Sequence, residues 1–149
     1  MRSTDPLDRF DLKRFIQAQD PVFDQVQDEL SDGHKRSHWM WFIFPQFTGL
    51  GDSEKSRHFA IRSTAEAVAF LEHPVLSTRL RTCTQLVLDI KHRPIAAIFG
   101  HPDELKFHSS MTLFAQVDAE DSLFSQALDQ YFHGIPDAWT LTLMDSKQT

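Results

Sequence analysis

The residues best suited to chemistry lie between Gly100 and Ser110, where polar side chains separate two apolar pieces. Asp103 and Lys106 are three positions apart, so they can pair on one face of a helix. Lys106 is followed by Ser109, which brings a cation close to a hydroxyl. Such a pair can serve as base and nucleophile, but the spacing alone assigns no catalytic residue. The serine can equally form a cap or turn with backbone N–H groups.

A second candidate element is the aromatic run 37–47, which contains two of the three tryptophans. Trp39 and Trp41 stand among apolar neighbours on every side, and a segment of this kind is expected in the middle of a core. Pro45 prevents one continuous helix through it. The same rings can alternatively form a wall for a flat ligand ring. His38 precedes the run, so its backbone is anchored while its imidazole can reach a surface cleft.

The charge distribution favours a small anion over a nucleic acid. The net charge of −6 argues against general nucleic-acid binding. Residues 33–62 and 79–93, however, each carry a net charge of +3. Two basic stretches on an acidic body can draw an anion to one place, although solvated helix faces explain them equally well.

These residues lead to a specific site hypothesis. The sequence predicts one pocket that includes His38, Asp103, Lys106 and Ser109 and touches Trp39 or Trp41. It would bind a small anionic or nucleotide-like ligand, and Asp103 would orient Lys106 or His38. The protein would then be a ligand-binding domain or a cryptic enzyme. An interaction adaptor without catalytic activity is the alternative, as is a domain whose polar residues only satisfy buried backbone groups. The histidine spacings match no zinc motif, so we expect neither metal nor cofactor.

The elements that must position these residues are predicted to be short helices. Ser63 and Glu66 have the spacing of a capping box, His73–Pro74 ends one helix and begins the next, and Asp121–Ser122 caps another. Alternating strand patterns are rare in the chain. We therefore predict a single all-α domain over 1–149, with a core at about 8–144 and an irregular array of about seven short helices.

Compartment and assembly follow from what the sequence contains. Cys83 is a single cysteine, so no intrachain disulfide can form, as is usual in reducing compartments. The longest apolar run, 39–44, is too short to cross a bilayer, and the first residues do not resemble a secretory signal. We expect a cytoplasmic protein that binds no membrane. The absence of a heptad seam predicts a monomer or a weak dimer.

The string HWMWFIFPQ at 38–46, followed by Gly49-Leu-Gly51, resembles the signature of a bacterial family of unknown function whose members are sometimes mislabelled as calpastatin. The similarity extends to FIQAQ at 15–19, to Phe99–Gly100 with Asp103 and Lys106, and to SSMTLF at 109–114. It covers about 8–144. The resemblance implies a small all-α domain and brings no established activity, cofactor or catalytic residue with it.

Overall fold

The computed structural model describes residues 8–147, and its regular elements are helices apart from one isolated bridge between Phe47 and Ile61. The helices are α1 (Lys13–Gln19), α2 (Phe23–Ser31), α3 (Met40–Ile43), α4 (Glu54–His58), α5 (Thr64–Glu72), α6 (Pro74–Leu88), α7 (Ile95–Phe99), α8 (Asp103–Ala115), α9 (Leu123–Phe132) and α10 (Ala138–Lys147). The all-α prediction is confirmed. Seven of these ten helices have at least seven residues, in line with the predicted number.

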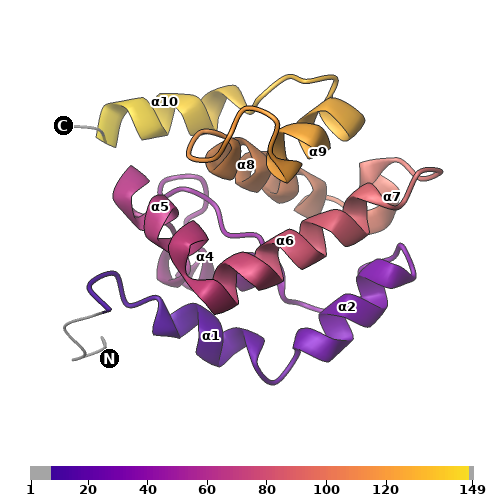
Figure 1. The fold of residues 1–149 in the computed structure, drawn as a ribbon, viewed down its shortest axis with the longest axis horizontal. Helices are drawn as coiled ribbons and strands as arrows, with labels where there is room; N and C mark the ends of the chain where they lie inside the picture. Colours follow the sequence, from indigo (N-terminus) through magenta and orange to yellow (C-terminus); the bar gives the residue numbers. More distant parts are fainter. Residues whose placement is uncertain (1–7, 148–149) are drawn as a thin grey trace.

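Helix α6 runs through the middle of the molecule, with α1 and α2 on one side and α8, α9 and α10 on the other (Figure 1). It packs against α2, α5 and α9, whereas α8 packs against α7, α9 and α10. In the part of the chain that the structure describes, none of the helices combines the length and apolar character needed to cross a membrane.

Local signals start the helices where the sequence predicts them. The Ser63 hydroxyl accepts a hydrogen bond from the Glu66 N–H at the start of α5. The Nδ1 atom of His73 accepts from the first N–H groups of α6, and Pro74 occupies the first position of that helix. The Ser122 hydroxyl caps α9. Each cap supplies an acceptor for N–H groups that have no partner inside the helix.

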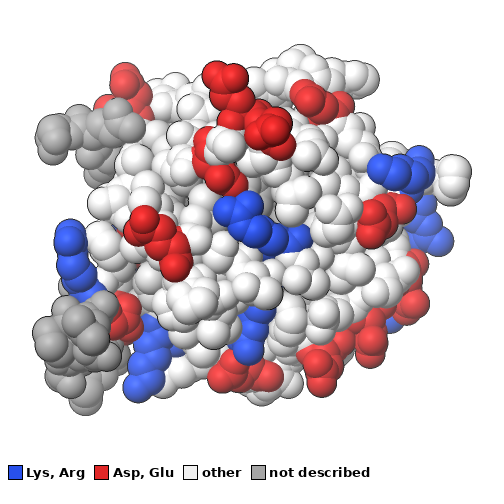
Figure 2. Space-filling view, in the orientation of Figure 1, with Lys and Arg blue, Asp and Glu red and all other residues white. Residues whose placement is uncertain are grey.

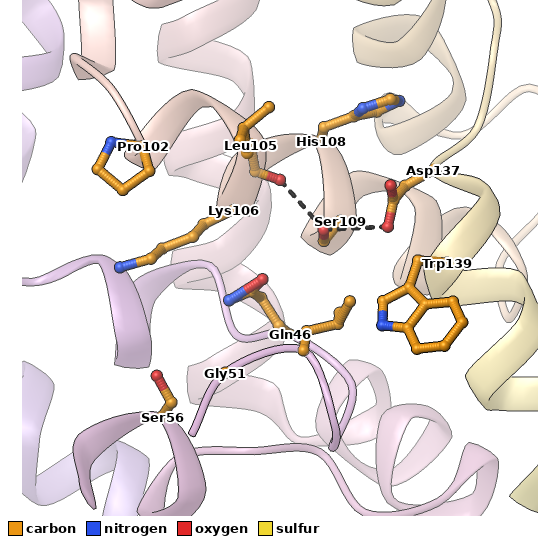
Figure 3. A pocket seen from close by; sticks show the side chains of 11 residues that line it. Gln46, Gly51, Ser56, Pro102, Leu105, Lys106, His108, Ser109, Asp137 and Trp139 are labelled. Carbon is orange, nitrogen blue, oxygen red and sulfur yellow. Dashed lines mark hydrogen bonds between the residues drawn. The ribbon is translucent and has the colours of Figure 1, made fainter. Parts of the chain in front are cut away.

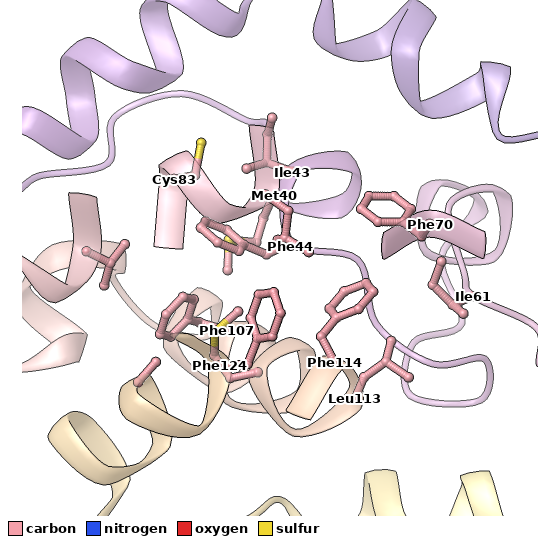
Figure 4. Close-up of a cluster of buried hydrophobic side chains, with 14 of the residues drawn as sticks. Met40, Ile43, Phe44, Ile61, Phe70, Cys83, Phe107, Leu113, Phe114 and Phe124 are labelled. Atoms are coloured by element: carbon pink, nitrogen blue, oxygen red, sulfur yellow. The ribbon is translucent and has the colours of Figure 1, made fainter. Parts of the chain in front are cut away.

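Most of the aromatic run lies in the core, as predicted (Figure 4), whereas Trp41 is only half-buried. Trp39 and Phe44 are at most 1% exposed. The ring of Phe44 makes edge-to-face contacts with Phe99 of α7 and Phe107 of α8, with centroid distances of 5.8 and 5.0 Å. Phe42 is half-buried, and its ring contacts that of Phe59 with a centroid distance of 5.4 Å. Phe44, directly after α3, therefore ties α7 and α8 to the core.

One buried carboxylate holds the segment that leads into α3. Glu29 of α2 accepts hydrogen bonds from the backbone N–H groups of Arg36 and Ser37, from the Ser37 hydroxyl and from the Trp39 indole. Burial raises the pKa of Glu29, but these hydrogen bonds outweigh it and bring the pKa down to about 2. The carboxylate is therefore charged and fully satisfied.

Candidate functional site

A pocket of about 300 Å³ lies between the segment after α3, the start of α4, helix α8 and the start of α10 (Figure 3). Its size is at the lower end of the range for small-molecule sites. The lining residues come from four places in the chain: Gln46, Leu50 and Gly51; Ser56; Pro102, Leu105, Lys106, His108 and Ser109; and Asp137 with Trp139.

Close packing around two glycines shapes the loop that forms one wall. Gly49 has a φ of +100°, which glycine adopts without strain. A Cβ atom on Gly49 would lie 3.1 Å from Leu143 of α10, so the loop rests directly on that helix. Gly51 lies so close to Ser56 that a Cβ atom would be 2.6 Å from the serine oxygen. The Ser53 hydroxyl then caps α4.

Lys106 lines one edge of this pocket, and two lysines from other segments, Lys35 and Lys55, share its partners. The Nζ of Lys106 lies 3.4 Å from Asp103 Oδ1, and the Nζ of Lys35 lies 2.8 Å from Asp103 Oδ2. Lys106 and Lys55 are both placed over the ring of Trp41, at 5.0 and 4.9 Å from its centroid. Lys106 thus shares the Asp103 carboxylate with Lys35 and the Trp41 ring with Lys55. Three ammonium groups linked in this way to one carboxylate leave a local excess of positive charge.

The opposite end of the pocket is held by α8 and the start of α10. The Ser109 hydroxyl donates to the Leu105 carbonyl and to Asp137, at 3.1 and 3.2 Å. His108 donates from Nε2 to the Ile135 carbonyl over 2.8 Å, because a carbonyl can only accept. Its ring also stacks on Phe132 with a centroid distance of 4.0 Å. These contacts fix the position of the polar side chains.

The structure brings several residues of the sequence hypothesis together. Lys106 and Ser109 line the pocket. Asp103 stands behind Lys106 and pairs with it, which is the orienting position that the sequence suggests. Trp41 lies beneath Lys106 and supports its side chain, although Trp41 itself is not part of the pocket lining.

Two other predicted residues lie elsewhere. Trp39 is buried, and its indole N–H donates to Glu29, so its role is in the core. His38 is exposed and is not part of the pocket lining. The reason is local: Glu29 binds both Ser37 and Trp39, which turns the Trp39 ring inward and leaves His38 on the outer side of the segment.

The sequence hypothesis does not include Gln46, Ser56, Asp137 or Trp139, which also line the pocket. Asp137 and Trp139 are far from Lys106 in sequence and reach it only because α10 packs on α8. A tryptophan in a helix whose apolar side chains are not confined to one face gives no local sign of a site. Gln46, in contrast, lies within the aromatic run, and it could have been found by asking which of the polar residues there has no apolar role.

Metal-ligating groups and the cysteine were the other candidates for chemistry in the part of the chain that the structure describes. Among the described residues, no three His, Cys, Asp or Glu side chains are grouped as a metal ion would need. Cys83 is fully buried in α6, and burial raises its pKa to about 12. A thiol of this kind is a small core residue and not a nucleophile.

Sequence comparison assigns the chain to a family. Residues 9–144 match the model of a family described as "Protein of unknown function (DUF1810)". The chain belongs to this family. The matched range covers every residue of the pocket lining, so the site lies wholly within the family domain. The family description assigns no activity.

A solved structure has the same fold. The crystal structure of the conserved hypothetical protein Rv1873 from Mycobacterium tuberculosis is 48% identical in sequence, with a TM-score of 0.91. The similarity covers 93% of this chain and 99% of that one. A comparison with curated proteins gave no match. The geometry of the pocket is therefore the basis for a functional proposal.

Proposed function

We propose that the pocket binds a small anionic ligand and that Lys106 contacts the anion. The observation that carries the proposal is that Lys35 and Lys106 share a single carboxylate, that of Asp103, while Lys55 and Lys106 both lie over the ring of Trp41. An excess of positive charge at the edge of a pocket attracts anions, and a charged donor makes hydrogen bonds that are about twice as strong as neutral ones.

The ammonium group of Lys106 has N–H donors available for a ligand. The pair between Asp103 and Lys35 is the shorter of the two, and the Lys35 side chain is only 6% exposed. Lys106 lies farther from the carboxylate, is 24% exposed and lines the pocket. An ammonium group has three N–H donors, so Asp103 can orient Lys106 without occupying it. The hydroxyl of Ser56 and the amide of Gln46 border the same space.

The proposal is tested by thermal unfolding in the presence of inorganic pyrophosphate. Ligand at a hundred times its Kd adds about 2.7 kcal/mol to the free energy of unfolding. We expect Lys106→Met, which keeps the aliphatic stem over Trp41, to remove this stabilisation. Lys91→Met is the matched control, because Lys91 is also exposed and hydrogen-bonded, to Gln130, but lies outside this pocket. The proposal would be contradicted if pyrophosphate stabilised both variants equally. It would also be contradicted if no anion stabilised the unaltered protein.

One observation favours an interaction adaptor as a second candidate. Leu105, Ile135 and Trp139 are 53%, 62% and 57% exposed, and all three belong to or adjoin the pocket walls. Exposed apolar side chains that gather in this way are typical of contact surfaces. Ile135 separates the candidates, since it is outside the pocket lining. Ile135→Ser leaves anion binding unchanged but weakens any protein complex formed through this surface.

We further propose that the protein works in the cytoplasm as a monomer or weak dimer, and that the string at 38–46 marks the family. A lone, buried cysteine supports a reducing compartment. The face shown in Figure 2 has positive and negative side chains interspersed, with acidic groups gathered over its upper part, and so lacks the broad basic field that nucleic-acid binding requires. Light scattering at micromolar concentration tests the assembly, and a stable tetramer would contradict it.

A further inference from the structure

The two ends of the pocket differ in chemistry. Lys106 lies at one end, Asp137 and Trp139 lie at the other, and Gln46 stands between them (Figure 3). A ligand that fills this space meets a cation, then an amide, then a carboxylate beside an exposed indole. The proposed function accounts only for the first of these groups.

Hydrogen bonds hold the Asp137 side chain in place, but they all involve one of its two carboxylate oxygens. Its Oδ2 accepts hydrogen bonds from the N–H and hydroxyl of Thr140 and from Ser109, which makes Asp137 the cap of α10. Its own N–H donates to Thr112 over 2.8 Å. Among the described residues, Oδ1 has no hydrogen-bond donor, and it is not buried. The pocket therefore contains a fixed carboxylate oxygen that can only accept.

A flat apolar surface lies beside this acceptor. The Trp139 side chain follows Asp137 by two residues, lines the pocket and is 57% exposed. Leu105 lines the pocket from α8 and is 53% exposed. Nucleic-acid bases stack on such a surface with little dependence on which base is present.

Gln46 provides a polar group between the two ends. Its side-chain amide has no hydrogen-bond partner among the described residues, is not buried, and is directed into the space between Lys106 and Trp139 (Figure 3). An amide both donates and accepts, which suits the hydroxyl groups of a sugar.

We propose that the ligand is a nucleoside monophosphate whose base carries an exocyclic amino group, as adenine and cytosine do. The proposal rests on the proposed function, since its phosphate is the anion at Lys106. The base lies against Trp139, and its amino N–H donates to Asp137 Oδ1. A base with an exocyclic oxygen at that position sets lone pairs against the carboxylate and binds more weakly. Asp137 thus determines which base is accepted.

Three nucleotides with the same phosphate and sugar test this inference by calorimetry. The three bases differ only at the position of the exocyclic amino group of adenine. Adenosine monophosphate has the amino group there, inosine monophosphate has oxygen, and purine riboside monophosphate has hydrogen. We expect the adenosine compound to bind about tenfold more tightly than the inosine compound, with the third in between. Equal affinity for all three would overturn the inference.

The variant Asp137→Asn makes the test directional. Asparagine caps helices as well as aspartate does, so its oxygen keeps the bonds to Ser109 and Thr140. Its NH₂ group then replaces Oδ1 and donates, and the preference changes from the adenosine to the inosine compound. Asp129→Asn removes the same charge outside the pocket and leaves the preference unaltered. An unchanged preference in Asp137→Asn would overturn the inference.

Two further measurements separate the possible failures. Asp137→Ser retains a capping oxygen but lacks the second one, so it binds all three nucleotides with the same affinity if the inference is right. Pyrophosphate does not reach the base end, and its affinity stays within twofold in each Asp137 variant. Equal binding of every nucleotide alongside good pyrophosphate binding refutes the base assignment alone. Loss of all binding in the unaltered protein refutes the proposed function with it.

Discussion

Trp39 and Trp41 are two positions apart in the sequence, but their surroundings are opposite. Trp39 is 1% exposed, and its indole N–H donates to Glu29 at 3.0 Å. Trp41 is only half-buried, has two ammonium groups over its ring, and its N–H is buried without a partner among the described residues. One ring is part of a satisfied network in the core, and the other lies beneath a lysine that lines a pocket.

The difference shows that the two regions use their polar groups differently: one stabilises the fold, and the other leaves groups available for binding. Around Glu29 every strong donor and acceptor in the cluster is paired, which stabilises the fold. Around the pocket, side chains such as Gln46 and Asp137 keep hydrogen-bonding capacity unused. Unused capacity lowers stability slightly and is useful only if another molecule supplies the partner. The contrast can be tested at the two tryptophans and at Glu29, whose carboxylate accepts a hydrogen bond from Trp39 and not from Trp41.

The largest effect is expected from truncation of each tryptophan. Trp39→Ala removes a fully buried ring and should lower the free energy of unfolding by about 3–5 kcal/mol. Trp41→Ala removes a half-buried ring and should cost about 1–2 kcal/mol, while it weakens pyrophosphate binding. Urea denaturation measures both. Similar costs for the two variants would mean that the rings do not differ in role.

Acid should act on the Trp39 region through Glu29. The pKa of Glu29 is about 2 in the folded protein against 4.5 for an unperturbed glutamate, so the folded state favours the charged carboxylate. Its contribution is complete above about pH 4.5 and is lost as the pH falls towards 2, and it amounts to about 3 kcal/mol. Glu29→Gln removes this part of the pH dependence. Denaturation curves between pH 6 and pH 3 compare the two proteins, and parallel pH profiles would contradict the assignment.

The smallest effect separates the two indole N–H groups. Trp39→Phe deprives the buried carboxylate of Glu29 of one donor and should cost about 1–3 kcal/mol. Trp41→Phe removes an unpartnered N–H and keeps a ring beneath Lys106, so the free energy of unfolding should stay within about 0.5 kcal/mol or rise. If Trp41→Phe proves as costly as Trp39→Phe, the Trp41 N–H has a partner after all.

Features encoded by neighbouring residues were predictable. The caps at Ser63, His73 and Ser122 depend on side chains that bond to N–H groups two or three positions ahead, and the composition of the aromatic run alone required burial. Glu29 is an intermediate case: it falls between Val26 and Leu30 on the buried face of α2. A carboxylate on an apolar face requires partners, and that signal was present.

The pocket was only partly predictable because tertiary packing completes it. Lys106 and Ser109 were found from their spacing within one helix. Asp137 and Trp139 join them through the docking of α10 on α8, which no local pattern encodes. The prediction that His38 lies in the pocket was wrong for the same reason. The hydrogen bonds from Ser37 and Trp39 to Glu29 decide which side of the segment faces outward.

The close approach of Gly49 to Leu143 has a consequence for motion. Because the loop rests on α10, and α10 also supplies Trp139, the wall of the pocket is intact only while that helix is docked. A ligand that binds as proposed would bridge the two pieces and would have to leave before α10 detaches. At a hundred times its Kd, it should slow hydrogen exchange of those α10 amides that exchange through detachment by about a hundredfold. Binding of the proposed ligand would therefore lower the fraction of time for which α10 is detached.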